Sequence, residues 1–149
     1  MKFFNETKTI IFGVVGLIGS FIANIFGGWD SAMTTLVIFM IIDYAAGLVV
    51  AGVFKKSKKT ENGALNSNVG WKGLSKKGMT LVIVLIAHRL DLALGTDFVK
   101  DATIIGYIMN ETLSIIENAG LMGVPIPSAI SEAIDMLKNK SDERGEVIK

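Results

Sequence analysis

The feature that most constrains this chain is the segment of residues 102–127, where a polar stripe runs along an otherwise apolar stretch. The polar side chains recur at the three- and four-residue spacing of one helix face, and they are Tyr107, Asn110, Glu111, Ser114, Glu117 and Asn118. The opposite face is hydrocarbon and consists of Ile104, Ile105, Ile108, Met109, Ile115 and Ile116. A charged group at the centre of a bilayer costs on the order of 3 kcal/mol, so such groups face a bundle interior or a water-filled cavity. We therefore expect this helix to line such a space.

A simpler interpretation of the same stripe is structural. Glu111 and Glu117 could serve only to bond neighbouring helices, or the segment could lie flat at the membrane interface. Both readings predict a helix, and they differ in what the carboxylates face.

The chain as a whole has the character of an integral membrane protein. Half of its 149 residues are hydrophobic, and its charges gather in a few places. We predict an all-α fold with four transmembrane helices at about residues 9–29, 31–54, 79–94 and 102–120. The first of these is long enough to cross a hydrocarbon core of roughly 30 Å. Residues 1–127 would form the membrane domain, and residues 128–149 a cytoplasmic amphipathic helix with a charged tail.

The distribution of basic residues sets the expected orientation. Of the 15 Lys and Arg residues, all but Arg89 and Lys100 lie in the N-terminal stretch, in the loop of residues 55–78 or in the C-terminal tail. By the positive-inside rule these three regions are cytoplasmic, which gives four crossings with both termini inside. Three crossings, with one segment re-entrant or peripheral, is the alternative, because the third and fourth segments are so polar.

The basic loop carries a second signal. Residues 66–78 interleave Val69, Trp71 and Leu74 with lysines, as a segment resting on anionic headgroups would. A solvated basic turn that serves only as a topology signal fits the same pattern. The candidate membrane-surface residues are Lys55, Lys56, Trp71, Lys72, Lys76 and Lys77.

Several ionisable residues fall within the expected membrane segments. Along ideal helices, Asp43 lies about 18 Å from residue 31, Arg89 about 16 Å from residue 78 and Glu111 about 14 Å from residue 102. We therefore expect Arg89 and Glu111 to meet at one level, with Asp43 close by. The predicted intramembrane polar layer, which would line a lumen, comprises Asp43, His88, Arg89, Asp91, Asn110, Glu111, Ser114, Glu117 and Asn118.

Small residues recur on the first two segments. Such residues let two helix backbones approach closely, which favours self-association in membranes. The candidate packing residues are Gly13, Gly16, Ser20, Gly47 and Ala51.

Enzymatic chemistry has little support in the sequence. The chain has no cysteine and one histidine, and it contains no nucleotide-binding loop, zinc-protease motif or nucleophile turn. We therefore expect no catalytic residue, no cofactor, no metal site and no nucleic-acid partner.

Three motifs together resemble the toxin-secretion/phage-lysis holin family, the small membrane proteins of phages and clostridial toxin loci. The matching region runs from about Asp43 to Leu137, and the first segment fits only by hydropathy. The motifs are Asp43 with Gly47 and Ala51; Asn66-Ser67-x-x-Gly70 with residues 73–77; and Asn110-Glu111-x-x-Ser114-Ile115-x-Glu117-Asn118 leading to Gly123-Val124-Pro125-Ile126-Pro127.

The resemblance implies a holin of the bacterial cytoplasmic membrane. Such a protein assembles into homo-oligomers and opens lesions that trigger cell lysis. An endolysin, or in some relatives a large toxin, then leaves through the lesions without needing to bind the holin. Members of the family are often drawn with three crossings, so a count of four departs from that picture. The family implies no catalytic residue.

Two other functions fit parts of the sequence. Four short helices with buried carboxylates also describe a small proton-coupled multidrug-type transporter, although such exporters do not need the long basic loop or the charged tail. A non-conducting antiholin or assembly factor would insert and associate without permeabilising the membrane.

Overall fold

The computed structural model describes residues 2–133 and residue 136. Within this part of the chain the structure is helical and contains no strand, as predicted. Residues 128–133 are helical, in agreement with the start of the predicted C-terminal helix. The rest of that helix, including Ile134 and Leu137, and the charged tail lie outside the described residues.

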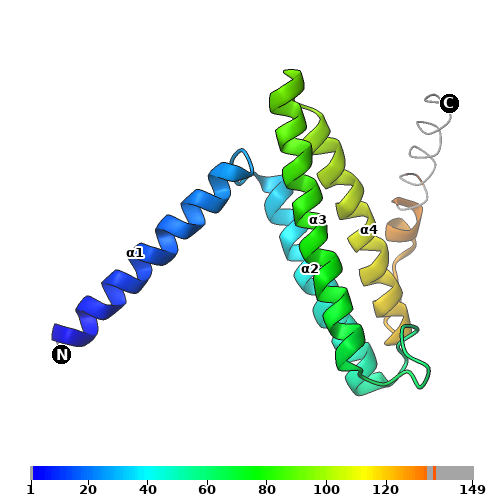
Figure 1. The fold of residues 1–149 in the computed structure, drawn as a ribbon. Coiled ribbons are helices and arrows are strands. Elements are labelled where there is room, and N and C mark those ends of the chain that lie inside the picture. Colours follow the sequence, from blue (N-terminus) through cyan, green and yellow to red (C-terminus); the bar gives the residue numbers. More distant parts are fainter. Residues whose placement is uncertain (1, 134–135, 137–149) are drawn as a thin grey trace.

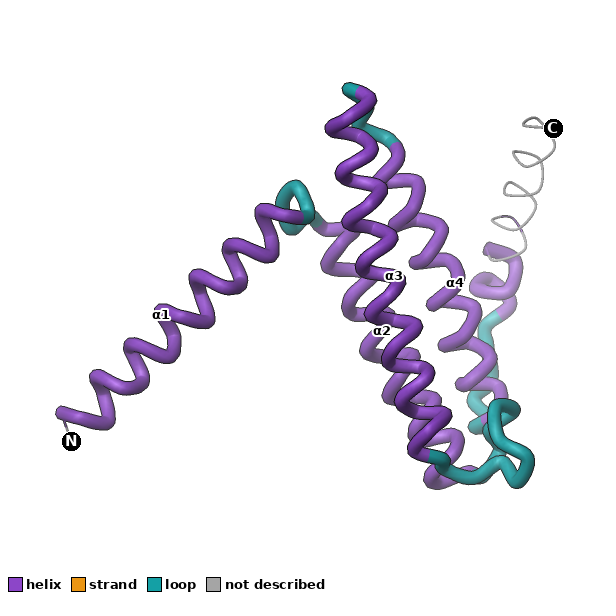
Figure 2. Tube along the Cα trace, in the orientation of Figure 1, coloured by secondary structure: helices purple, strands orange, loops and turns teal. Residues whose placement is uncertain are grey.

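The described helices comprise one that stands apart and three that form a bundle. Helix α1 (Lys2–Ile25) projects away from α2 (Ser31–Val49), α3 (Ser67–Leu94) and α4 (Val99–Leu121), which pack side by side (Figure 1). A short π-helical turn, η1 (Val50–Phe54), continues α2. Successive helices of the bundle run in opposite directions, and their connections lie at its two ends (Figure 2).

Capping residues decide where the helices begin and end. The Asp30 carboxylate accepts the Met33 N–H at 2.7 Å and starts α2. The Asn66 side chain accepts the N–H groups of Asn68 and Val69 at 2.9 and 3.3 Å, so α3 begins twelve residues before the predicted start at residue 79. Part of the predicted basic loop is therefore helical. Gly95, with a φ of 68°, ends α3 in the left-handed conformation that glycine adopts without strain.

The bundle is held together by a small apolar core. Its fully or largely buried members come from all three helices and are Met33, Leu36, Met40, Val84 and Ile104. Helix α4 contacts both α2 and α3, whereas α2 and α3 contact each other much less.

The turn between α1 and α2 requires glycine. Gly27 and Gly28 have φ values of 74° and 99°, and Gly28 N–H donates to Ala23 O at 2.9 Å, which closes the end of α1. The turn explains why α1 ends at Ile25, before the predicted limit at residue 29. A Cβ on Gly27 would lie 2.2 Å from His88 Cε1, so the imidazole of α3 packs directly against this turn.

Helix α1 is exposed on every side in the isolated chain. Residues 6–22 are exposed throughout, and a Cβ added at Gly13, Gly16 or Gly19 would meet nothing within 4 Å. The described part of the chain therefore provides no packing partner for Gly13 or Gly16, and Ser20 is exposed. In contrast, the packing residues of the second segment do have neighbours. A Cβ added at Gly47 would lie 3.9 Å from Asn118 Nδ2, and Ala51 is buried.

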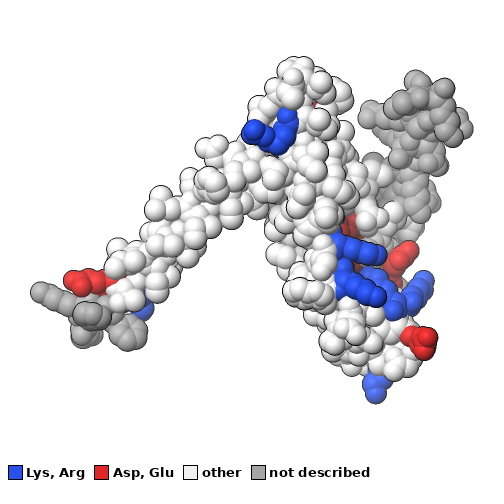
Figure 3. Space-filling model, in the orientation of Figure 1, with Lys and Arg blue, Asp and Glu red and all other residues white. Residues whose placement is uncertain are grey.

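Two of the described helices are long and apolar enough to cross a membrane, namely Glu6–Ile25 and Ser31–Phe54. The surface of α1 is almost free of charge along its length, as expected for a helix that crosses a membrane. Lysines gather instead near the basic loop (Figure 3). The polar residues of α3 and α4 face partly inward, as described next.

Candidate functional site: a buried charge cluster and the cavity beside it

A lysine of α3 joins all three helices of the bundle. Lys77 Nζ lies 2.9 Å from Asp43 Oδ2 on α2 and 2.5 Å from Glu111 Oε2 on α4. The side chains of these three residues are 13%, 9% and 8% exposed, so the ion pairs are largely withdrawn from solvent. Asn118 Nδ2 donates to Asp43 Oδ1 at 3.0 Å and thereby binds the second oxygen of that carboxylate. We refer to Asp43, Lys77, Glu111 and Asn118 as the charge cluster.

Helical spacing brings these groups together. Glu111 and Asn118 are seven residues, or two turns, apart on α4, so they project from the same face. Gly70, Gly73 and Lys77 are likewise spaced by three and four on α3. A Cβ on either glycine would lie 3.6 or 3.8 Å from the Tyr44 ring system, which shows that α3 passes close to α2 at this point. Lys77 lies on this same face of α3 and extends from it into the interior.

The composition of the cluster has an energetic consequence. Two carboxylates share one ammonium group, so the cluster as drawn carries one net negative charge. Removing one partner of a buried ion pair typically costs about 3–5 kcal/mol, because the remaining charge is left without compensation. Lys77 is therefore the residue on which the burial of both carboxylates depends.

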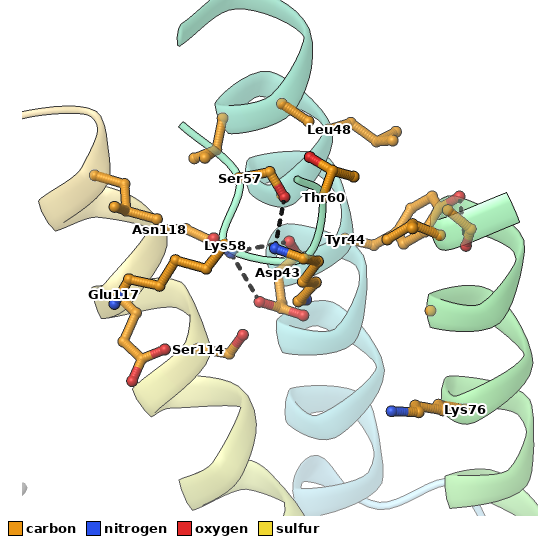
Figure 4. A pocket seen from close by; sticks show the side chains of 18 of the residues that line it. Asp43, Tyr44, Leu48, Ser57, Lys58, Thr60, Lys76, Ser114, Glu117 and Asn118 are labelled. Carbon is orange, nitrogen blue, oxygen red and sulfur yellow. Dashed lines mark hydrogen bonds between the residues drawn. The ribbon is translucent and has the colours of Figure 1, made fainter. Parts of the chain in front are cut away.

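A cavity of about 290 Å³ adjoins the charge cluster. Its walls come from α2, α3, α4 and the loop after η1, and Figure 4 shows the side chains that converge on it. Its polar lining outside the cluster includes Tyr44, Ser57, Lys58, Lys59, Thr60, Lys76, Asn110, Ser114 and Glu117. The cavity is large enough for a small molecule or several waters, since one water occupies about 30 Å³ in the liquid.

The loop that walls the cavity has a defined shape. Ser57 N–H donates to Gly63 O at 3.0 Å, and Thr60 Oγ1 donates to Ala64 O at 2.9 Å. Gly63, with a φ of 68°, sits so close to Lys55 that a Cβ would lie 2.2 Å from the Lys55 carbonyl oxygen. Residues 55–66 therefore form a compact loop closed at its neck, rather than an extended linker.

The structure brings together most, but not all, of the predicted polar layer. Asp43, Glu111 and Asn118 belong to the charge cluster, and Asn110, Ser114 and Glu117 line the adjoining cavity. His88 instead packs on Gly27 at the other end of the bundle. The remaining two predicted members, Arg89 and Asp91, also lie apart from the cluster.

The structure corrects the expectation that Arg89 meets Glu111. Glu111 pairs with Lys77, and Arg89 is exposed. The depth count failed because α3 begins at Ser67 and not near residue 79. Measured from the connection between the two helices, Arg89 lies about 8 Å before the end of α3, whereas Glu111 lies about 18 Å into α4.

Asp91 belongs to a second polar cluster near the connection between α3 and α4. Its carboxylate accepts Thr96 Oγ1 at 2.6 Å and the N–H groups of Val99 and Lys100 at 3.0 and 2.8 Å. It therefore caps α4, whose own cap residue makes no such bond. Lys100 Nζ in turn lies 3.0 Å from Asp30 Oδ2, which connects the start of α4 with the start of α2.

Asp30 is held in its ionised form by this environment. The Met33 N–H that donates to its carboxylate is the largest influence and lowers the pKa of Asp30 below the usual value. Burial, which is next in size, opposes it, and the Lys100 ammonium lowers the pKa further. Asp30 thus serves both as the cap of α2 and as the partner of Lys100.

Sequence analysis missed the role of Lys77, which it placed on the membrane surface. The spacing of Gly70, Gly73 and Lys77 was available as a signal, but only once residues 66–78 are recognised as helix. The other predicted surface residues Lys55, Lys56, Trp71, Lys72 and Lys76 are exposed. Several lysines form a patch on the part of the molecule that holds the basic loop (Figure 3).

Comparison with known proteins identifies the family. A model described as the bacteriophage holin family matches residues 20–139, which is most of the chain and includes the charge cluster and the cavity. The chain belongs to the bacteriophage holin family. The match confirms the resemblance drawn from the sequence motifs. It begins within α1, so the family model leaves out most of that helix.

The chain is also similar to individual proteins of phages and bacteria. A probable holin of Bacillus phage phi105 is 30% identical over 112 residues, which cover 74% of this chain and 77% of the phage protein. An uncharacterized 14.9 kDa protein in the nagH 3' region of Clostridium perfringens is 41% identical over 138 residues, or 91% of this chain and 98% of that protein. The uncharacterized protein Lmo0128 of Listeria monocytogenes is 38% identical over 133 residues, or 89% of each chain. No solved structure matches the chain.

Membership of the holin family has two direct consequences. The family is non-enzymatic, which agrees with the prediction made from the motifs. Together with the two apolar helices, it indicates a protein of the cytoplasmic membrane with a holin function.

Proposed function

We propose that this holin accumulates as a closed bundle in the cytoplasmic membrane and then assembles into lesions through which an endolysin, or a large toxin, leaves the cell. The observation that carries the proposal is the charge cluster, in which a single lysine keeps two carboxylates buried. Intramembrane charges face a bundle interior or water. In the proposed mechanism these charges face the bundle interior in the closed protomer, and they face water after assembly.

The proposed opening step exchanges partners within the charge cluster. When α3 moves away from α2 and α4, Lys77 leaves Asp43 and Glu111, and all three charges need water. An assembled ring offers that water as a lumen lined by Asn110, Glu111, Ser114 and Glu117 on one face of α4.

Assembly is proposed to use α1. Residues 6–22 of this helix, including Ser20, are exposed, and a Cβ at Gly13 or Gly16 would meet no atom of the described residues within 4 Å. Close approach of two helices through small residues stabilises association within lipid. A second copy of the chain is therefore the proposed partner, and an endolysin need not bind directly.

We further propose four crossings with both termini in the cytoplasm. The 28 residues of α3 extend about 42 Å, more than a hydrocarbon core of about 30 Å, so the first turns of α3 would emerge on the inner side. These turns carry the exposed Trp71, Lys72 and Lys76, which suit a surface of anionic lipids. The chain has no cysteine, so single substitutions Ser57→Cys and Asp97→Cys can be labelled from either side. Four crossings require that the cysteine at position 57 is labelled from the cytoplasmic side and the cysteine at position 97 from the outside.

The decisive experiment follows permeabilisation in a bacterium. The protein is expressed under control while membrane potential, viability and escape of a folded reporter enzyme are recorded, with and without an endolysin. We expect delayed, abrupt depolarisation and, when endolysin is present, release of the reporter. Steady potential despite confirmed insertion would instead indicate an antiholin, and saturable substrate export without loss of viability would indicate a transporter.

A double variant tests the lumen itself. Replacing Glu111 and Glu117 by Leu removes the carboxylates of the α4 face while leaving the apolar length of the helix intact. We expect insertion to persist and permeabilisation to be lost or mistimed. Normally timed, undiminished lysis by this variant would exclude the lumen assignment.

A further inference from the structure

The cavity beside the charge cluster has two chemically different walls. Toward α4 it presents hydrogen-bond acceptors, above all Glu111, Ser114 and Glu117. Toward the basic loop it presents the cationic Lys58 and Lys59. Figure 4 shows Lys58 extending from the loop across the cavity toward α4. A ligand that pairs with both the Glu111 carboxylate and the lysines of the loop must carry a positive group and a negative group.

Glu111 has capacity for a further donor. Its Oε2 accepts Lys77, whereas its Oε1 accepts no hydrogen bond from any described residue. No fully buried side-chain oxygen among the described residues lacks a partner, so Oε1 is open to accessible space, and Glu111 lines the cavity. The open oxygen favours an ammonium group, which supplies hydrogen-bond donors to a carboxylate.

The opposite wall suits a phosphate. Lys58 and Lys59 supply ammonium groups, and the Ser57 and Thr60 hydroxyls lie on the same compact loop. The lining also includes the apolar side chains of Leu48, Leu65 and Val69. A volume of about 290 Å³ is far larger than a single ion requires, and it accommodates a zwitterionic headgroup.

The position of the cavity decides the source of the ligand. With α3 oriented as in the proposed function, the charge cluster lies about 18 Å from the outer ends of α2 and α4, in the inner half of a core of about 30 Å. The cavity continues from there to the basic loop, at the level of the lipid headgroups. We propose that it binds the headgroup of an aminophospholipid, with the primary ammonium at Glu111 and the phosphate at Lys58 and Lys59.

This inference rests on the membrane orientation of the proposed function but not on pore formation. A headgroup bridging α4 and the loop spans the opening of the cavity and adds contacts that exist only in the closed bundle. The bound lipid therefore stabilises the closed protomer, and its loss favours separation of α3. Binding is saturable and requires N–H donors on the headgroup.

The test uses the full chain in detergent with short-chain lipids as probes. Thermal unfolding and native mass spectrometry are recorded with phosphatidylethanolamine, phosphatidylcholine and phosphatidylglycerol, and with free phosphoethanolamine. We expect saturable binding and a raised midpoint with phosphatidylethanolamine alone among the lipids. Phosphatidylcholine lacks N–H donors, and phosphatidylglycerol lacks the cation.

Two variants and a control identify the site. Glu111→Gln removes the charge that the ammonium needs, and the exposed Lys58→Ala removes a phosphate contact without disturbing the core. We expect each to weaken binding by about tenfold or more, the factor that corresponds to 1.4 kcal/mol. Asp97→Asn, on the exposed connection between α3 and α4, should bind as the parent chain does.

The outcomes separate this inference from the proposed function. Equal binding of phosphatidylcholine, or unchanged binding by both Glu111→Gln and Lys58→Ala, would overturn it. Binding of free phosphoethanolamine but of no lipid would assign the cavity to a soluble amine and would also overturn it. Delayed lysis that persists without any lipid selectivity would leave the holin mechanism intact and reject only the headgroup site.

Discussion

At the scale of single residues, the charge of Lys77 matters more than that of the exposed lysines around it. Replacing it by Met keeps the length of the side chain but leaves Asp43 and Glu111 buried without a counter-charge. We expect Lys77→Met to destabilise the closed bundle by about 3–5 kcal/mol and to bring lysis forward. Thermal unfolding in detergent and the time of depolarisation in cells measure the two effects.

The adjacent residue provides the matched control for this prediction. Lys76 is exposed, so Lys76→Met should change unfolding by less than about 0.5 kcal/mol. Adding Asp43→Asn and Glu111→Gln to Lys77→Met should restore much of the lost stability, because the buried charges are removed together. Equal behaviour of the Lys76 and Lys77 variants would contradict the central role of the charge cluster.

The carboxylate of Asp30 gives the bundle a defined pH dependence. Its pKa is lowered in the folded state, chiefly by the Met33 N–H and also by Lys100, so its ionised form stabilises the fold. The contribution is fully present above the unfolded pKa near 3.8 and is lost as pH falls through the lower folded value. Unfolding midpoints measured between neutral and strongly acidic pH should fall accordingly. Asp30→Asn should lower the neutral-pH midpoint and flatten this part of the curve, and a parallel shift without flattening would contradict the assignment.

At the scale of the helices, the turn between α1 and α2 is the most sensitive joint. Gly27 and Gly28 both have positive φ, so alanine at either position costs about 1–2 kcal/mol in backbone strain. Only at Gly27 would the added Cβ also strike the His88 ring, at 2.2 Å, whereas at Gly28 it meets nothing within 4 Å.

The two glycines therefore form a matched pair for measurement. We expect Gly27→Ala to lower the unfolding midpoint clearly more than Gly28→Ala, and His88→Ala to remove the difference between them. If both alanine variants behave alike in the presence of His88, then the imidazole does not fix this turn. The experiment thus tests whether α3 holds the joint from which α1 extends.

At the scale of the whole molecule, α1 is the helix that packs against no helix of the bundle. Gly16→Leu should leave the bundle intact, because a Cβ at Gly16 meets no atom of the chain, yet it should obstruct close approach by α1 of a second copy. We expect fewer cross-linked oligomers in membranes and delayed lysis. Val15→Leu, a neighbouring exposed change outside the small-residue stripe, is the control. Unaltered cross-linking by Gly16→Leu would move the assembly surface elsewhere.

Much of this molecule could be predicted because the relevant signals are local. Apolar segment length, the period of 3.6 residues and lysine distribution identified a helical membrane protein, and the motifs around Asp43 and residues 110–127 identified the holin family. The same periodicity correctly grouped Glu111, Ser114, Glu117 and Asn118 on one face of α4. A helix face depends only on residue spacing along one segment, and spacing is fully contained in the sequence.

What only the tertiary structure decided is which charges meet across helices. Asn66 starts α3 early enough to turn Lys77 from a surface residue into the partner of Asp43 and Glu111, while Arg89 lies near the far end of the same helix. A capping bond that moves a helix start by twelve residues shifts the register by about 18 Å along its axis. Contacts between helices depend on that register and on the turns that join them, and no single segment of the sequence contains both.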